Sequence, residues 1–358
     1  MESINSIRSK LWKKKLSRSE RAEAIIDVDG TLASTTGECK EGIGISYNGI
    51  WGYHPLMLSL ANTLEPLYLV NRSGNSASNK GAVEWIDRAV ALVRTSFDRV
   101  CLRGDTDFAL TRNFDRWTAD GVRFAFGMDA KQNLVKVAES LDKGCWRVLR
   151  RREKRAANTQ RRKRPVNIKE QIVIERHYQN LKLQSEQVAE FSYRPARCKG
   201  TYRVIVLKKT LSVEKGQLLL WEDIRYFFYI TNIKELSPAE VVYFCNDRCN
   251  QENLIEQLKN GLKALRMPVK DLVSNWAYMV MASLAWTLKA WFALLVRTQE
   301  RRNELLRMEF RRFLNAIMRM PVQIINTGRR IIYRVLGYND WVQTFLNTFD
   351  TIRQLRLA

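Results

Sequence analysis

The chain has 358 residues, enough to bury one large core or two modest ones, and its 46% hydrophobic content argues against disorder. It carries 60 Lys and Arg against 37 Asp and Glu, a formal net charge of +23. Three stretches hold 21 of these charges: residues 1–22 (+5), 147–164 (+9) and 297–334 (+7). Cations on phosphates release counterions, so basic stretches of this kind favour a nucleic-acid partner.

The cysteines and the N-terminus argue against a secreted or zinc-binding protein. The chain has six cysteines and two histidines, with no CxxC pair and no clustering of the two residue types in sequence. This pattern indicates reduced thiols in a cytosol and not a disulfide framework. The first residues are charged throughout and contain no apolar core, so they do not resemble a secretory signal.

The first third of the chain alternates strands and helices after an antiparallel start. Residues 25–33, with the sequence IIDVDGTLA, predict a buried strand that ends in acids, and the Gly-rich residues 37–58 have the texture of a hairpin. A strand near 66–72 follows. Apolar residues at helical spacing predict a helix over 79–97, before a strand that ends in LRGD. Later elements in this part are a helix near 109–119, a strand at 122–128 and a helix at 130–141.

Residues 145–232 predict an inserted, mostly β module. A basic run opens it, and strand-like segments follow, QIVIERHY, VAEFSYRPA, TYRVIVLKK and RYFFYITNI. Trp221 lies among basic residues there. Its indole could stack on an extruded DNA base, although a buried structural tryptophan is the commoner case.

The C-terminal third predicts helices. Ser237, Pro238 and Glu240 form a capping box with proline at the first helical position, so a helix begins there with unusual clarity. Further helices are predicted at 275–296 and 299–320. The first of these is very apolar, but Lys289 interrupts it, which favours a buried core helix over a membrane span.

The acids of the first strand fit two chemistries. DVDGTL matches the first motif of haloacid-dehalogenase-like phosphatases, in which Asp27 would be the nucleophile, with Ser73, Lys80 and the GDTDF stretch as weaker matches. That fold requires a helix or cap and a parallel sheet after this motif, and here a hairpin is predicted. It also leaves the +23 charge and everything beyond residue 130 without a role.

A metal-dependent nuclease accounts for more of the chain. Three carboxylates on rigid elements can hold two divalent cations, which activate a water and stabilise a leaving oxygen. Asp29 and Asp105 each end a predicted strand, and Glu252 lies on the helix that begins at Ser237. Arg248, Glu252 and Lys259 are spaced i, i+4 and i+11, which places them on one helix face. Two cations flanking a carboxylate suit a metal-bound phosphate, whereas an ordinary solvated ion pair is the simpler interpretation.

These motifs resemble those of the DDE transposases of bacterial insertion sequences, transposase DDE domain group 1. The resemblance runs from about residue 24 to 290 and is carried by IIDVDGT, VNRSGNSAS, LRGDTDF, YFFYITN and NDRCNQENLIEQLK. It implies a ribonuclease-H-like α/β core, a mixed sheet flanked by helices, with a β-rich insertion and a helical C-terminal region. It also implies Asp29, Asp105 and Glu252 as catalytic ligands of two Mg²⁺ or Mn²⁺ ions.

The resemblance further implies that Arg248 and Lys259 bind DNA, as the last residues of a Tyr, Arg, Glu, Lys signature. At the signature tyrosine this chain has Cys245, and Tyr243 is the nearest substitute. Asp27 competes with Asp29 as the first ligand. Asp29 is preferred because it directly precedes the small residue and Thr31, which leaves Asp27 as a helper or a hydrogen-bonded core acid.

Five segments are expected from these patterns. They are a basic N-terminal arm (1–23), the first part of the core (24–144), a basic β-rich insertion (145–232), the glutamate helix of the core (233–270) and a helical C-terminal region (271–358). Only 28 residues precede Asp29, where such enzymes have a longer DNA-binding segment, so the chain could be a truncated remnant that only binds DNA. The expected partners are double-stranded transposon ends and target DNA, with no membrane, a homodimer on DNA, and a cytoplasmic location at the bacterial nucleoid.

Overall fold

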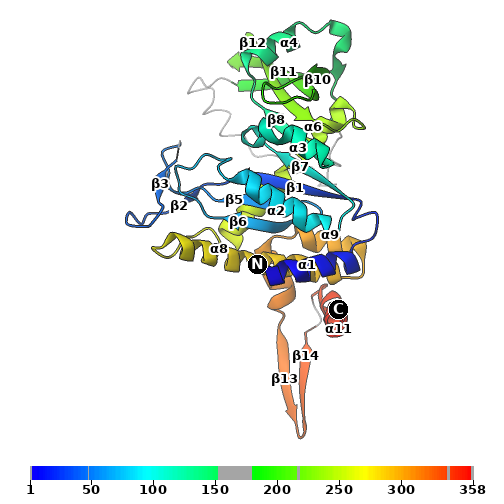
Figure 1. Cartoon of the computed structure of the whole chain (residues 1–358). Helices are drawn as coiled ribbons and strands as arrows, with labels where there is room; N and C mark the ends of the chain where they lie inside the picture. The colour runs from blue at the N-terminus through cyan, green and yellow to red at the C-terminus, as the bar shows by residue number, and fades with distance from the viewer. Residues whose placement is uncertain (1, 47, 152–179, 216–217, 337–338, 356–358) are drawn as a thin grey trace. The chain divides into compact units, whose positions relative to one another are not determined.

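The computed structural model describes residues 2–46, 48–151, 180–215, 218–336 and 339–355. The chain divides into two compact units, Met1–Phe124 with Asp247–Ala358, and Ala125–Asn246 (Figure 1). Most of the predicted basic run at 147–164, the strand-like segment QIVIERHY and His177 lie outside the described residues.

The first unit is built on a mixed sheet. Strand β1 (Glu23–Gly30) pairs antiparallel with β5 (Leu56–Leu60) and parallel with β7 (Arg99–Gly104), and β5 pairs antiparallel with β6 (Glu65–Val70). The strand order is β6-β5-β1-β7, with β8 (Val122–Met128) next to β7. Three antiparallel strands, followed on the other side of the first by a parallel one, are the order of a ribonuclease-H-like core. The predicted fold class is confirmed.

Helices flank this sheet, and short strands follow β1. The helices are α1 (Glu2–Lys15), α2 (Ala82–Arg94), α3 (Phe114–Ala119), α7 (Cys249–Glu256), α8 (Leu272–Leu295), α9 (Gln299–Arg307), α10 (Phe310–Phe313) and α11 (Val342–Arg353). The short strands are β2 (Ala33–Ser34), β3 (Gly44–Ile45) and β4 (Trp51–Tyr53). The last two lie in the segment that was predicted to form a hairpin.

Helix α8 contributes to a hydrophobic core and does not stand apart from the fold. Its Met279, Trp286 and Ala293 are buried in a cluster with Met57 of β5 and Leu254 of α7. Within the described residues α8 is also the one helix long and apolar enough to cross a membrane, and half of its most apolar window is buried inside the protein. The predicted core helix at 275–296 agrees with this packing.

The N-terminal residues, predicted as a basic arm, form helix α1, which is docked on the first unit. Trp12 is completely buried, and its indole N–H donates to Glu65 Oε2 at 2.9 Å. Arg8 pairs with the other oxygen of Glu65 at 3.1 Å, and Trp291 of α8 donates to that same oxygen at 2.7 Å. The lysines at 10, 13 and 14 stay exposed, which explains why the segment looked like a solvated arm.

The second unit is dominated by long antiparallel strands. β10 (Asn180–Tyr193) pairs with β11 (Tyr202–Lys215), which pairs with β12 (Leu218–Thr231), as the predicted β-rich module required. The last residues of β8 pair with β12, and β9 (Arg147–Val148) pairs with β10. Helices α4 (Gln132–Glu139) and α6 (Pro238–Asn246) complete this unit. Trp221 on β12 is 51% exposed, so the interpretation as a buried structural tryptophan was wrong.

The C-terminal region is less helical than predicted. Instead of one helix over 299–320, the chain forms α9, α10 and the π-helical turn η5 (Leu314–Met318). The ammonium group of Lys289 explains the first break, because it donates to the carbonyl oxygens of Leu306 and Met308 where α9 ends. Beyond it lies an unpredicted hairpin, β13 (Val322–Thr327) and β14 (Arg330–Val335), whose side chains are mostly exposed.

Candidate active site

The ends of β1 and β7 bring two predicted ligands to one edge of the sheet. The strands are parallel, and their register pairs Val28 with Gly104, so the next residues, Asp29 and Asp105, follow at equivalent positions. Asp105 then caps the short 3₁₀ turn η1 (Thr106–Phe108), where its Oδ1 accepts from the backbone N–H of Asp107 at 3.0 Å. The expectation that these strand ends carry neighbouring carboxylates agrees with the structure.

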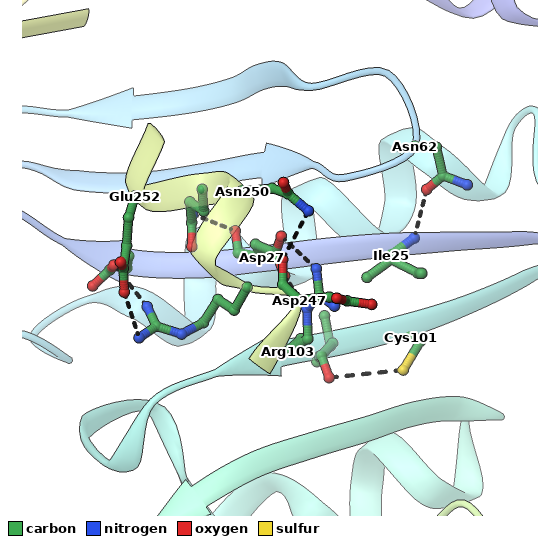
Figure 2. Close-up of polar contacts among 12 residues, drawn as sticks. Ile25, Asp27, Asn62, Cys101, Arg103, Asp247, Asn250 and Glu252 are labelled. Atoms are coloured by element: carbon green, nitrogen blue, oxygen red, sulfur yellow. Dashed lines mark hydrogen bonds and ion pairs between the residues drawn. The ribbon is translucent and has the colours of Figure 1, made fainter. Parts of the chain in front are cut away.

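The guanidinium of Arg248 interacts electrostatically with all three acids. Its guanidinium donates to Asp29 Oδ2 at 2.8 Å and lies 3.6 Å from Glu252 Oε1, one turn further along the chain. The other oxygen of Asp29, Oδ1, accepts from the Gly30 N–H at 2.8 Å. Figure 2 shows Glu252 on its helix above the strands that carry Asp27 and Arg103. All three predicted acids therefore lie within the electrostatic reach of one arginine.

The pKa values of the two strand acids reflect this crowding. Burial raises the pKa of Asp29 to about 6, the charge of Asp105 adds to the rise, and Arg248 opposes it. Burial also raises the pKa of Asp105, again against the pull of Arg248. Neighbouring carboxylates held out of water favour any cation that reaches them, and this is the electrostatic setting of a divalent metal site.

These side chains do not form a complete metal site in their present positions. Within the described part of the chain, no three Asp, Glu, His or Cys side chains form a group that could hold an ion. The side chain of Glu252 is 59% exposed, and Arg248 engages it together with Asp29. The hard oxygen donors suit Mg²⁺ or Mn²⁺, and Glu252 would have to leave its ion pair with Arg248 to join Asp29 at an ion.

Asp27 is a core acid and not a nucleophile. It is only 1% exposed, and both its oxygens accept hydrogen bonds from Arg103, at 2.5 and 2.9 Å. Burial raises the pKa of the Asp27 carboxyl, and the bonds from Arg103 oppose that rise. An acid sequestered in this way cannot attack a phosphate ester. This observation, with the hairpin after β1, removes the phosphatase interpretation and confirms Asp27 as the hydrogen-bonded core acid.

Arg103 and Gln251 position the site, and neither was identified from the sequence. The amide of Gln251 donates to the Asp27 carbonyl at 3.0 Å, which fastens α7 directly to β1. A signal for Arg103 was present. Asp27 and Arg103 are 76 residues apart, as are Asp29 and Asp105. Equal separations along two parallel strands place both pairs side by side.

The glutamate helix begins as predicted but is not continuous. The backbone N–H of Ser237 donates to the side chain of Glu240 at 2.8 Å, and the Glu240 N–H donates back to Ser237 Oγ at 3.4 Å, which closes the capping box. Helix α6 ends at Asn246, and Arg248 is the N-cap of a new helix, α7. The next turn, η4 (Gln257–Gly261), is π-helical.

These breaks alter the predicted face. Arg248 and Glu252 remain a one-turn ion pair, and Lys259 falls in the π-helical turn. Burial lowers the pKa of Lys259, and the negative charges of Glu256 and Asp29 oppose that change, so Lys259 is near the strand acid. Tyr243, the substitute for the signature tyrosine, donates its hydroxyl to the Arg150 carbonyl within the second unit, and Cys245 is buried.

Comparison with known proteins identifies the family of the chain. The family model described as transposase DDE domain group 1 matches residues 1–357. The chain belongs to this family. No curated protein matches it. Among solved structures, the cryo-EM structure of a piggyBac transposase synaptic complex with hairpin DNA is similar at 11% identity and a TM-score of 0.40. The match covers 82% of this chain and 54% of that one, so the chain spans about half the length of this relative.

Proposed function

We propose that this transposase-family protein cuts DNA strands and transfers them, with Asp29, Asp105 and Glu252 as its ligands for two divalent ions. The observation that carries the proposal is the gathering of these three acids around Arg248, in a member of a DDE family. Bound Mg²⁺ or Mn²⁺ would activate a water and stabilise the leaving 3′-oxygen.

The basic residues beside the acids would act by binding DNA phosphates. Arg248 donates one hydrogen bond to Asp29 from the N-terminal end of α7, and a guanidinium can form a bidentate contact with a phosphate. Exchange of Asp29 for a DNA phosphate would free the carboxylate for an ion and hold the scissile strand. Lys259 would hold a second phosphate, because its half-buried cation has no carboxylate within ion-pair distance among the described residues.

The proposed partners follow from the same chemistry. Double-stranded DNA, as transposon ends and as target, is the substrate, and joining two ends calls for a homodimer on DNA. We place the protein in the cytoplasm, at the nucleoid. Trp221, half exposed on β12, is available to stack on an extruded base.

A plasmid-nicking assay with Mg²⁺ or Mn²⁺ tests the proposal. Wild-type protein should convert supercoiled plasmid to open circles, and Glu252→Gln should bind the plasmid with the same affinity without nicking it. Glu84→Gln, which changes an exposed carboxylate of α2, is the control and should keep nicking, because Glu84 touches no DNA in this scheme. Nicking that survives Glu252→Gln would refute the assignment of the glutamate.

A protein that binds DNA without cutting it is the second candidate. The observation in its favour is that Arg248 occupies the space between Asp29 and Glu252, and that no three ligating side chains are gathered in the described residues. In that case wild type and Glu252→Gln would bind plasmid alike, with steep salt dependence, and neither would nick it.

A further inference from the structure

A cavity lies beside the candidate active site, between the two segments that carry Asp29 and Glu252. Its volume is about 560 Å³. One wall is Leu32 and strand β2, three to five residues after Asp29, and the other is the π-helical turn after α7 and the segment beyond it. The lining residues are Leu32, Ala33, Ser34, Lys259, Asn260, Lys263, Leu265 and Arg266.

The cavity is cationic and holds no acid. Three of its eight lining residues are Lys259, Lys263 and Arg266, and none is Asp or Glu. In the described chain, none of the three cations lies within ion-pair distance of a carboxylate. Burial lowers the pKa of Lys259, so the protein keeps this ammonium partly out of water without a direct counterion. Like charges gathered at such a cost are stabilised by an anion that lies among them.

The backbone of this segment is held in an uncommon conformation. Lys263 has φ +58° and Met267 has φ +52°, in the left-handed region that side chains with a Cβ rarely adopt. Contacts on both sides fix the turn. The Tyr278 hydroxyl donates to the Lys263 carbonyl at 3.1 Å, and the Lys40 ammonium donates to the Met267 carbonyl. Lys263 and Arg266 are therefore presented by a preorganised turn and not by a flexible loop.

We propose that this cavity binds the sugar-phosphate backbone of the DNA strand that continues away from the Asp29 site, with Lys263 and Arg266 each contacting a phosphate. Ser34 and Asn260 supply neutral donors on opposite walls of the same cavity. The inference rests on the proposed function, because the strand in the cavity is the substrate of the neighbouring acids. It assigns a role to two cations outside the Arg248, Glu252 and Lys259 pattern.

The test is the salt dependence of DNA binding by the full chain carrying Lys263→Gln and Arg266→Gln. Fluorescence anisotropy of a labelled duplex, with a chelator present to prevent cutting, gives the association constant at several salt concentrations. Loss of two phosphate contacts should reduce the slope of log K against log salt by about 1.8, because each contact contributes about 0.9. The matched control is Lys131→Gln with Lys136→Gln, two exposed lysines at α4 that remove the same charge.

The outcomes separate the cavity from the proposed function. An unchanged slope for the cavity variant, or an equal drop for the control, overturns the inference even if wild type nicks plasmid. A drop confined to the cavity variant supports the inference even if no cutting is ever seen, and the proposed function then fails alone. Lys263→Arg with Arg266→Lys keeps both charges and should restore the slope. Both side chains are exposed, so thermal unfolding should be unaffected.

Discussion

Lys289 gives the sharpest test of the packing of α8. The residue is 1% exposed, its ammonium lies 3.7 Å from the centre of the Trp286 ring, and it donates to the carbonyls of Leu306 and Met308. Burial lowers its pKa from 10.5 to about 7. We expect Lys289→Met to stabilise the protein at pH 7 and to destabilise it at pH 10.

The sign follows from proton linkage. A lysine whose folded pKa lies below its unfolded pKa binds fewer protons when folded, so stability rises with pH between the two values. The two pKa values differ by about 3.5, and one pKa unit is worth about 1.4 kcal/mol. Lys289 therefore costs about 4 kcal/mol at pH 7 and about 1 kcal/mol at pH 10.

The methionine side chain removes this cost but cannot donate hydrogen bonds. Loss of the donor to two carbonyls costs about 1 kcal/mol each, or about 2 kcal/mol in total. The net effect of Lys289→Met is then a gain of about 2 kcal/mol at pH 7 and a loss of about 1 kcal/mol at pH 10.

Urea unfolding of wild type and variant at both pH values measures this difference. Lys10→Met, on the exposed face of α1, is the control, and its difference from wild type should not change between the two pH values. If the difference for Lys289→Met is the same at pH 7 and pH 10, the lysine is not held out of water as the structure shows, and the reasoning fails.

Three further substitutions test the fold around the site. Arg103→Met leaves Asp27 as a buried charge without its partner and should cost about 3–5 kcal/mol in urea unfolding, and a cost below 1 kcal/mol would show that the acid is solvated. Ser237→Ala removes the cap of α6 and should cost about 1 kcal/mol, with an unchanged unfolding midpoint as the contrary result. Trp12→Phe keeps the ring but loses the donor to Glu65, and should cost about 1–2 kcal/mol by thermal unfolding; an equal melting temperature would mean that α1 is not docked.

The sequence predicted the acidic edge of the sheet well because its signals are local. A strand that ends in acid can be seen in IIDVDG and in RVCLRGD, and parallel pairing of the two strands then fixes which residues are neighbours. The same logic would have identified Arg103, two residues before Asp105, as the partner of Asp27. It was missed because a buried ion pair gives no periodic pattern, only a matching separation along two strands.

The helix that carries Glu252 shows which features local sequence signals do not predict. The capping box fixes where α6 begins, since it depends on four consecutive residues. The end of α6 at Asn246 and the π-helical turn at Gln257–Gly261 have no such local signature. In the structure, Gln257 Oε1 accepts from the backbone N–H of Phe310 at 3.0 Å, a contact with a residue 53 positions away. Tertiary contacts of this kind determine the helix, and they cannot be read from spacing.

The missed hairpin gives only a weak sequence signal. Ile324 and Ile325 are adjacent, so β13 has no strict alternation of apolar and polar residues, and the clearest local feature is Gly328, which adopts φ +43° in the turn. The arginines of this region favour an amphipathic basic helix, and the predicted helix at 299–320 therefore ends past Met318. An exposed hairpin buries little on either face, so neither strand needs the alternation of apolar and polar residues that would predict it.

The charge distribution of the first unit suits the binding of divalent cations next to a polyanion. Asp29, Asp105, Glu252 and Arg248 together carry three negative charges and one positive charge, so this small region is anionic in a chain of net +23. The cavity of Lys259, Lys263 and Arg266 lies beside it, and all the charged residues that line it are basic. Divalent ions and DNA phosphates attract one another in solution. On the proposed function, the acids would attract the divalent ions and the cavity would attract the DNA phosphates, so an ion held by the acids would lie next to the strand in the cavity, near Asp29.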